Sequence, residues 1–260
     1  MLKRPGAIQM NACIVIPFYN HPRTIAQMVE DLKPLGLPCF IVDDGSDAQA
    51  QQVLAQIVNE VSWVKVRRLP ENRGKGAAVM AGCDAAQASG FTHALQIDAD
   101  GQHDVADAAR LLEQARRNPA AMISGEAIYD STVPRSRRYG RYLTHVWVWI
   151  NTLSFEIRDS MCGLRVYPLA ATCAIWHESS VGRRMDFDPE IMVRLSWKGV
   201  RIIAVPTRVT YPRDGVSHFK MLEDNVWISR MHARLFFGML WRMPAMLARR
   251  VFQRRSGAAV

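Results

Sequence analysis

Two short acidic clusters in this sequence have the residue types and spacing to bind a divalent metal ion. Asp43-Asp44-Gly45-Ser46 follows one apolar run, and Asp98-Ala99-Asp100-Gly101-Gln102 follows another. On an extended segment, carboxylates two residues apart point to the same side, and their oxygens suit Mg²⁺ or Mn²⁺. We therefore predict that Asp98 and Asp100 share one such ion, whose remaining positions accept diphosphate oxygens.

The acidic clusters also have a purely structural explanation, because Asp and Gly form turns after strands. A calcium-binding loop is excluded by the spacing, since Gly101 stands fourth from Asp98, whereas such a loop has its glycine at the sixth position. The presence of two clusters, each at the end of a predicted strand, favours a site over two unrelated turns.

A basic, glycine-rich turn at Asn72-Arg73-Gly74-Lys75-Gly76 is a candidate phosphate-binding element. It brings Arg73, Lys75 and flexible backbone amides to a predicted helix N-terminus, which favours anions. The turn lacks the upstream glycine and the Ser or Thr of a P-loop. Pro17-Phe18-Tyr19-Asn20, which follows the first predicted strand, lacks the glycines of a dinucleotide fingerprint. The sequence thus lacks both common nucleotide-binding motifs at these positions.

The hydrophobic pattern predicts an α/β fold that would position these residues. Short apolar runs, typical of buried strands, alternate with segments whose apolar residues recur at helical spacing. We expect strands at 13–16, 39–42, 64–66, 93–97, 121–124, 164–167, 201–205 and 208–211, helices at 22–32, 48–58, 76–88, 105–117 and 188–197, and a helical tail from 211. This alternation indicates a mainly parallel sheet with helices on both faces, which binds ligands at the carboxyl ends of its strands.

Four motifs occur in the order and spacing of family 2 nucleotide-sugar glycosyltransferases. They are Ile16-Pro17-Phe18-Tyr19-Asn20, Val42-Asp43-Asp44-Gly45-Ser46, the basic turn at 72–76, and Asp98-Ala99-Asp100-Gly101-Gln102-His103. Over roughly residues 11 to 220, the sequence resembles the dolichyl- and polyprenyl-phosphate sugar synthases of that family. The resemblance implies a Rossmann-like, type-A glycosyltransferase fold. It also implies an inverting transfer from a nucleotide diphosphate sugar to a membrane lipid, with polyprenyl phosphate as the expected acceptor.

The same resemblance assigns roles to individual residues of this sequence. The residues expected to hold the nucleoside are Pro17, Tyr19, Asp43 and Asp44, with Asn20, Arg73, Lys75 and Ala99 beside the donor, and those expected to hold the metal are Asp98, Asp100 and Gln102. Asp159-Ser160-Met161-Cys162-Gly163-Leu164-Arg165 resembles a segment that places Arg165 at a phosphate, and Arg137 or Arg138 resembles a second phosphate-binding arginine. Gly215-Val216-Ser217-His218-Phe219-Lys220 resembles a loop that closes over the diphosphate, which makes Ser217 and Lys220 binding candidates.

An acidic segment around Asp188 is the candidate source of a general base. Phe187-Asp188-Pro189-Glu190 resembles a Phe-Asp-x-Glu motif of the synthases. Asp188 is the first candidate, with Asp186 and Glu190 behind it. A phosphate acceptor arrives ionised and needs no base, whereas a hydroxyl needs one within hydrogen-bond reach. Alternatively, the three acids only stabilise the start of a helix by complementing its dipole.

Two alternatives to this function remain open. His21 and His218 stand where the synthases usually have glutamate and lysine, so the acceptor could instead be a hydroxyl of a glycolipid or another lipid of the cell envelope. A different class of function is that of a catalytically idle, membrane-bound partner of another enzyme. The intact pair Asp98 and Asp100 argues against an idle site.

The charge distribution predicts attachment to an anionic membrane surface. The formal net charge is +9, and after Asp224 the sequence has seven arginines and no acid. Arginines beside Leu235, Phe236 and Trp241 suit a membrane interface. An acid-free segment at 131–155 either belongs to the same surface or is a core helix. No uncharged apolar segment is long enough to span a bilayer, and no RNA-binding motif or zinc finger indicates nucleic acid as a partner.

The cysteines and the first residues predict the compartment. Five cysteines are scattered without a Cys-x-x-Cys pair, and no apolar stretch resembling a signal peptide follows Met1. We therefore expect a reduced, cytoplasmic protein, peripheral on the cytoplasmic face of the inner membrane. Its expected parts are an N-terminal extension (1–10), a catalytic domain (11–212), and a closing loop with a basic amphipathic tail (213–260). The oligomeric state is left open.

Overall fold

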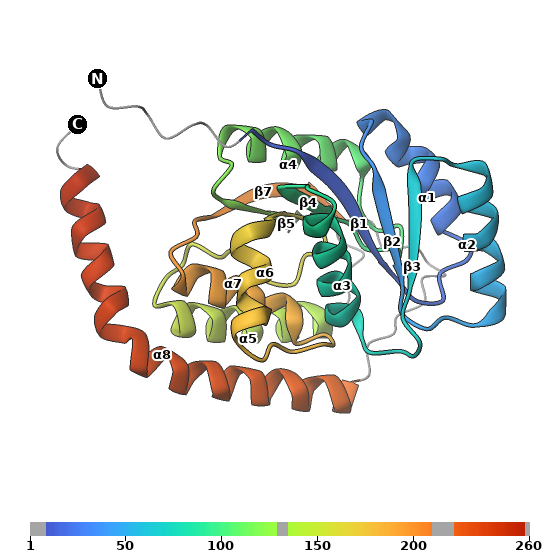
Figure 1. Ribbon diagram of the computed structural model, residues 1–260. Coiled ribbons are helices and arrows are strands. Elements are labelled where there is room, and N and C mark those ends of the chain that lie inside the picture. Colours follow the sequence, from blue (N-terminus) through green and yellow to red (C-terminus); the bar gives the residue numbers. More distant parts are fainter. Residues whose placement is uncertain (1–8, 129–134, 210–220, 258–260) are drawn as a thin grey trace, which may run out of the picture.

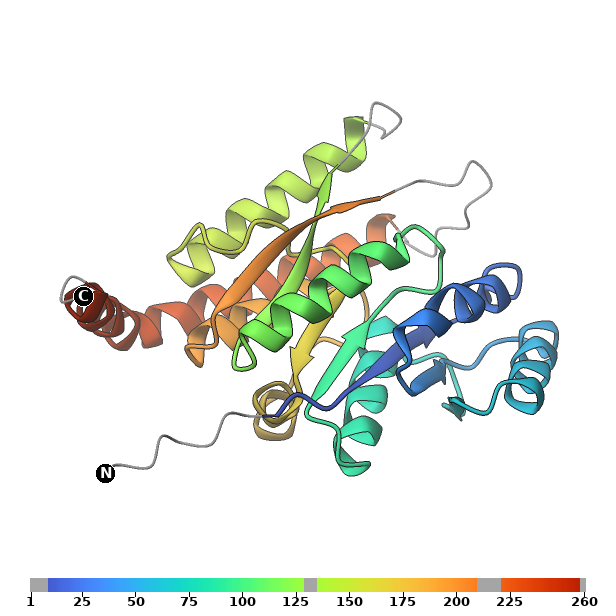
Figure 2. The ribbon, with the colours of Figure 1, turned by 90° about the horizontal axis from the view of Figure 1, so that it is seen from above.

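A seven-stranded sheet runs through the computed structural model, with helices on both of its faces (Figures 1 and 2). Residues 9–128, 135–209 and 221–257 are described, and within them the side chains of 135–139, 221 and 250–257 are not. The strands are β1 (Ala12–Phe18), β2 (Cys39–Asp43), β3 (Val64–Arg68), β4 (His93–Gln96), β5 (Met122–Ile128), β6 (Arg165–Pro168) and β7 (Ile202–Arg208). The helices are α1 (Ile25–Leu32), the 3₁₀ turn η1 (Lys33–Leu35), α2 (Ala48–Glu60), α3 (Lys75–Ala88), α4 (Val105–Arg117), α5 (Arg135–Thr152), α6 (Leu169–Glu178), α7 (Phe187–Trp197) and α8 (Met221–Gly257).

The order of the strands explains where a site can form. The sheet runs β3-β2-β1-β4-β6-β5-β7, and β1 is parallel to both of its neighbours, β2 and β4. The carboxyl ends of these three strands therefore meet at one edge. β6 is antiparallel to β4, and Arg165 at its start pairs with Gln96 at the end of β4. The start of β6 thus lies at the same edge, and the prediction of a mainly parallel sheet covered on both faces is confirmed.

Two apolar layers hold the helices to the sheet. Every residue of β1 is buried, as expected for a central parallel strand. Ile14 and Ile16 belong to the layer under α1, α2 and α4, whereas Cys13 and Val15 belong to the layer that includes α3, α6 and α7. The alternation follows from the two-residue repeat of a strand, which sends successive side chains to opposite faces.

The structure differs from the predicted secondary structure in two places. Helix α6 lies at 169–178, where no element was predicted; its buried and half-buried apolar residues leave no clear helical stripe. Two strands were predicted at 201–205 and 208–211, whereas β7 is one continuous strand across Pro206. Since β7 is an edge strand, a proline can occupy it without interrupting two ladders of hydrogen bonds. The end of the second expected strand lies outside the described residues.

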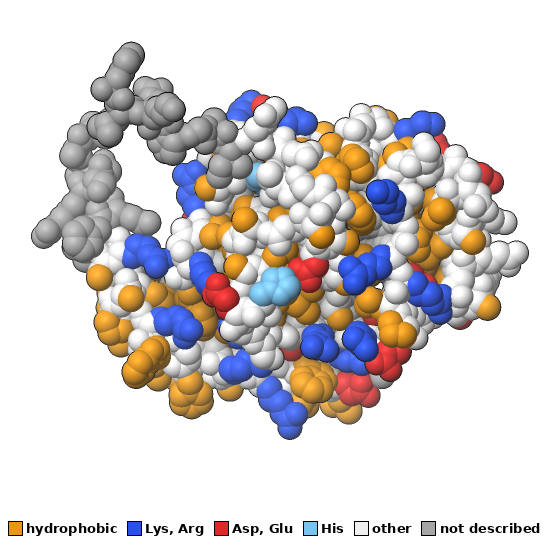
Figure 3. Space-filling view, in the orientation of Figure 1, with side chains coloured by type: hydrophobic (Ala, Val, Ile, Leu, Met, Phe, Trp, Pro, Cys, Tyr) orange, Lys and Arg blue, Asp and Glu red, His pale blue; other side chains and the backbone are white. Residues whose placement is uncertain are grey.

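The long helix α8 belongs to the core and also forms a surface. Ile228, Met231, Leu235 and Met239 are buried on its inner side, and α8 packs against α5 and α7. α8 lies along the lower edge of Figure 1 and bends in its second half, which contains Pro244. Hydrophobic and basic side chains are interspersed along this edge in Figure 3.

Candidate active site

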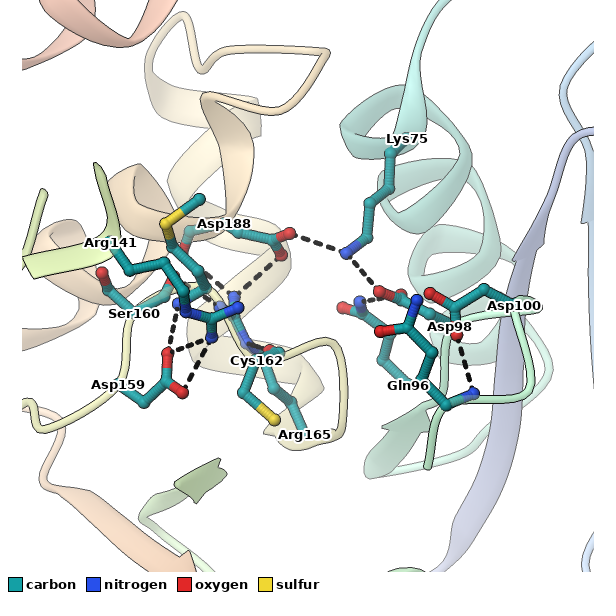
Figure 4. Close-up of polar contacts among 12 residues, drawn as sticks. Lys75, Gln96, Asp98, Asp100, Arg141, Asp159, Ser160, Cys162, Arg165 and Asp188 are labelled. Carbon is teal, nitrogen blue, oxygen red and sulfur yellow. Dashed lines mark hydrogen bonds and ion pairs between the residues drawn. The ribbon is translucent and has the colours of Figure 1, made fainter. Parts of the chain in front are cut away.

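Lys75, the first residue of α3, joins two halves of the candidate site (Figure 4). Its Nζ donates to Oδ2 of Asp98, in the turn after β4, and to Oδ2 of Asp188, in the first turn of α7, at 2.7 Å each. Burial alone would lower the pKa of Lys75, but the two carboxylates raise it well above its ordinary value. Lys75 therefore stays charged, and its ion pairs connect the β4 edge to α7.

Asp98 and Asp100 lie together but differ in their partners. β4 ends at Gln96, so both aspartates lie in the turn that follows rather than on the extended segment that the sequence analysis assumed. Asp98 also accepts a hydrogen bond from Gln96 Nε2 at 3.1 Å, and although burial opposes it, Lys75 lowers the pKa of Asp98. Asp100 accepts one from the backbone N–H of Gln102 at 3.0 Å. Burial, and then the charge of Asp98, raise the pKa of Asp100 to about 6.

This arrangement fits a hard divalent cation in its donor chemistry. Asp98 and Asp100 bring two carboxylates to one turn, and the lysine that pairs with Asp98 is shared with Asp188, so the turn favours an additional positive charge. Their oxygens, with the amide oxygen of Gln102 close by in sequence, are the ligand type that Mg²⁺ and Mn²⁺ prefer. Within the described part of the chain, no three or more His, Cys, Asp or Glu side chains converge on a common metal position. Asp98, Asp100 and Gln102 are thus the residues of this turn whose oxygens could hold such a cation.

Gly163, in the loop before β6, had no predicted role, although it belongs to the motif that ends at Arg165. A Cβ atom at this position would lie 1.8 Å from Oδ2 of Asp98. Any larger residue at this position would therefore displace the Asp98 carboxylate. Its close approach, together with the hydrogen bond from Gln96, restricts the Asp98 side chain.

Arg165 does not face the open site, contrary to the expectation that it binds a phosphate. Its side chain is fully buried. The guanidinium donates to the carbonyls of Cys162 and Ser160 at 2.7 and 2.8 Å and contacts Asp188 Oδ1 at 3.0 Å. Arg165 instead fixes the loop before β6 to the start of α7, beneath the site.

Only one of the three candidate acids of α7 reaches the site. Asp188 lies between Lys75 and Arg165, one cation on each carboxylate oxygen. Asp186 is buried beside the preceding loop and accepts from the backbone N–H of Arg184.

Glu190 also lies away from the Lys75 cluster. It is fully buried and pairs with Arg194 at 2.7 Å and with Arg234 of α8 at 2.6 Å. It also accepts from the backbone N–H of Gly182 at 2.9 Å. Glu190 therefore connects α7 to α8 and to the loop before α7.

The acidic cluster after β2 organises the basic turn. Both oxygens of Asp44 accept backbone hydrogen bonds, from Arg73 and Gly74, at 2.8 Å each. Burial raises the pKa of Asp44 despite these bonds. Asp43 accepts from the backbone N–H of Ser46 at 2.9 Å and pairs with Arg68 at 3.0 Å. The cluster thus holds the turn at the end of β2, a role that the sequence analysis did not foresee.

Most of the other residues predicted to bind the nucleotide sugar lie near the carboxyl ends of β1, β2 and β4. Pro17 is buried in β1, Tyr19 is half-buried just after it, and Asn20 accepts from the backbone N–H of Asp47, all at the same edge as Asp43. Ala99 is buried between the two aspartates, and the exposed guanidinium of Arg73 pairs with Glu71. For Arg137 and Arg138 only the backbone, in α5, is described, and Ser217 and Lys220 lie outside the described residues.

A second ion pair at the site was missed by the sequence analysis. Arg141 of α5 places Nη2 2.9 Å from both oxygens of Asp159 (Figure 4). His145 Nδ1 lies 3.2 Å from the Ser160 hydroxyl. Burial raises the pKa of Asp159, but Arg141 and the backbone N–H groups of Met161 and Ala127 together outweigh it, so the net shift is downward. These contacts hold α5 against the loop before β6. In the sequence, the four-residue spacing of Arg141 and His145 could have indicated that both lie on one face of a helix.

Comparison with known proteins identifies the class first. Solved glycosyltransferases share the fold of this chain. Glucosyl-3-phosphoglycerate synthase from Mycobacterium tuberculosis, solved with Mn²⁺ and UDP-glucose, matches with a TM-score of 0.63 and 13% identity over 90% of this chain and 79% of that one. A mannosyltransferase from Pyrobaculum calidifontis, solved with GDP-mannose and Mn²⁺, matches with a TM-score of 0.54 and 14% identity over 99% and 78%. The fold is therefore the type-A glycosyltransferase fold.

The family follows from the sequence comparison. The sequence model of glycosyl transferase family 2 matches residues 13–183, and this chain belongs to that family. An uncharacterised protein of Methanocaldococcus jannaschii is 24% identical over 80% of this chain and 93% of its own length. A dolichyl-phosphate β-glucosyltransferase of Dictyostelium discoideum is 27% identical over 69% of this chain and 60% of its own. The chain thus spans about three fifths of that eukaryotic relative, and the resemblance to the lipid-phosphate sugar synthases is confirmed.

Proposed function

We propose that this protein transfers a sugar, with inversion, from a nucleotide diphosphate sugar to the phosphate of a membrane polyprenyl phosphate. The observation that supports a phosphate acceptor is the position of Asp188. Its two carboxylate oxygens already contact Lys75 and Arg165, and the other candidate acids, Asp186 and Glu190, lie away from the Lys75 cluster. A hydroxyl acceptor needs a base within hydrogen-bond reach, whereas a phosphate arrives as an anionic nucleophile. The site therefore suits an ionised acceptor.

The proposed reaction is a single in-line displacement. An oxygen of the acceptor phosphate forms a bond to the anomeric carbon while the bond to the diphosphate oxygen breaks, and the nucleoside diphosphate leaves with the electron pair. Asp98, Asp100 and Gln102 would hold Mg²⁺ or Mn²⁺, which stabilises the charge on the departing diphosphate. Pro17, Tyr19 and the loops that Asp43 and Asp44 hold in place would bind the nucleoside.

Matched acceptors test the proposal directly. Transfer from radiolabelled nucleotide sugars should label polyprenyl phosphate, and polyprenol of the same chain length should gain less than about one hundredth of that label, because the candidate base Asp188 is held between two cations. Equal labelling of polyprenol or of an extracted hydroxylated lipid would favour the hydroxyl acceptor. No transfer to any acceptor and no donor hydrolysis would favour the idle partner protein.

We further propose that the outer face of α8 binds the cytoplasmic face of the inner membrane. Large apolar side chains on this face are exposed, among them Leu222, Phe237 and Trp241 at 85%, 70% and 86%. Arg230 lies on the same helix beside Trp227, and exposed apolar side chains with a neighbouring arginine suit an anionic lipid surface. Arg242 and Arg249 also belong to α8 but contact Trp197 of α7. Among the described residues, no helix combines the length and the apolar content that crossing a membrane requires.

Point substitutions test membrane binding better than removal of α8, because the helix also contributes to the core. Phe237→Glu combined with Trp241→Glu should weaken binding to phosphatidylglycerol-containing vesicles about tenfold or more, since both rings would leave the interface. Co-sedimentation measures this binding. Val58→Glu, at an exposed apolar position of α2, is the matched control and should bind like the wild type. Equal binding by the double variant, or no binding by the wild type, would contradict the proposal.

A further inference from the structure

Lys75 lies where a divalent cation bound to Asp98 would have to compete with it. Its ammonium is 2.7 Å from Oδ2 of Asp98, one of the two carboxylates expected to hold the metal. An ammonium and a divalent ion repel each other strongly when they share one oxygen in a partly buried site. The side chain of Lys75 is 16% exposed, so water screens that repulsion poorly. The ion pair therefore opposes metal binding in the free protein.

Asp98 cannot easily move aside to relieve the competition. The backbone at Gly163 packs against its carboxylate, and Gln96 donates to its other oxygen. Lys75, in contrast, has a flexible four-carbon side chain and a second carboxylate partner, Asp188, at 2.7 Å. A short movement toward Asp188 or toward a bound phosphate would free Oδ2 of Asp98. Lys75 is thus the member of the pair that can change partners.

From this geometry we propose that Lys75 holds the cation position at Asp98 in the free protein and transfers to the diphosphate of the donor when the metal binds. The inference rests on the proposed function, because it takes the metal and the nucleotide diphosphate as ligands. Lys75 begins α3, whose N-terminal amides also favour phosphate, so the new partner lies within reach of the old one. Metal and nucleotide then bind cooperatively, each assisting the other by the same factor. Lys75 acts here as a positioning residue.

Binding of Mn²⁺, measured by electron paramagnetic resonance without a sugar acceptor, tests the exchange. Lys75→Met should bind Mn²⁺ alone about tenfold or more tightly than the wild type, because the competing charge is gone. Addition of UDP or GDP should strengthen Mn²⁺ binding to the wild type about tenfold more than to the variant, as the lost coupling requires. Lys65→Met is the matched control, since Lys65 is exposed in the first half of β3, away from the carboxyl edge. It should behave like the wild type.

The possible outcomes distinguish the exchange of Lys75 from the metal-dependent transferase function on which it rests. Tighter Mn²⁺ binding and weaker coupling in both Lys75→Met and Lys75→Gln, each with a cooperative thermal transition, would support the exchange. Equal Mn²⁺ affinity in these variants and the wild type, or equal enhancement by nucleotide, would overturn the exchange while leaving a metal-dependent transferase intact. Failure of the wild type to bind Mn²⁺ with either nucleotide would overturn the metal-dependent function and the exchange with it.

Discussion

We expect Asp100→Asn to lower kcat/KM for sugar transfer about 10³-fold or more while leaving the fold intact, because a metal ligand can contribute several kcal/mol to stabilising the transition state. Asp100 lies in the turn after β4, accepts one hydrogen bond from the backbone of Gln102, and carries a charge that Asp98 opposes. Asparagine can accept the same hydrogen bond without that charge. The variant should therefore unfold at the same temperature as the wild type or above it.

The control for this experiment lies four residues further along the chain. Asp104 caps the N-terminus of α4 by accepting from the backbone N–H of Ala106. Asp104→Asn removes the same charge, and asparagine caps helices about as well, so activity should be unchanged. Excess chelator should abolish wild-type transfer, and Mg²⁺ or Mn²⁺ should restore it. Full activity in chelator, or an active Asp100→Asn variant, would refute the metal site.

The second large effect is on stability. Glu190→Ala should lower the free energy of unfolding by about 3 kcal/mol or more, because loss of one partner leaves the other charges of a buried network without compensation. Glu190 is fully buried, and its substitution leaves Arg194, with a side chain only 14% exposed, without its carboxylate. Arg234 is half exposed and should contribute less. Urea unfolding at neutral pH measures the difference.

A surface glutamate provides the comparison for Glu190. Glu113 pairs with Arg116 and Arg117 on α4, and all three side chains are about half exposed or more. Glu113→Ala should cost no more than about 0.5 kcal/mol, because water and salt screen such pairs. Similar losses of unfolding free energy in Glu190→Ala and Glu113→Ala would show that the buried network stabilises this fold no more than a surface ion pair does.

The sheet could be predicted from the sequence, and so could the strand ends that carry the candidate site, because both depend on local patterns. Continuous apolar runs predict central parallel strands, and the acids that follow β2 and β4 must then meet at the shared edge. α6 was missed because its apolar residues do not form one helical stripe. The extent of β7 was misjudged because Pro206 is acceptable only at an edge strand, and the strand order is not visible in the sequence.

The roles of the charged residues depended on burial, which no local pattern reports. Arg165 and Glu190 have the residue types of a phosphate ligand and a general base, yet each is fully buried among protein partners. Lys75 was expected to face phosphate, but it lies between Asp98 and Asp188, which are 23 and 113 residues away from it in the sequence. Pairings over such distances follow from the tertiary fold alone.

The antiparallel direction of β6 limits how the chain can change its length in evolution. Because β6 starts where β4 ends, the loop that precedes it reaches the reactive edge, and the connection that follows it, from Pro168 into α6, lies at the opposite edge. An inserted residue near Gly163 would push the backbone into the carboxylate of Asp98. An insertion between Pro168 and α6 would lie away from that carboxylate. Length changes before β6 are therefore limited by the Asp98 carboxylate, whereas those after it are limited by the packing of the buried Leu169.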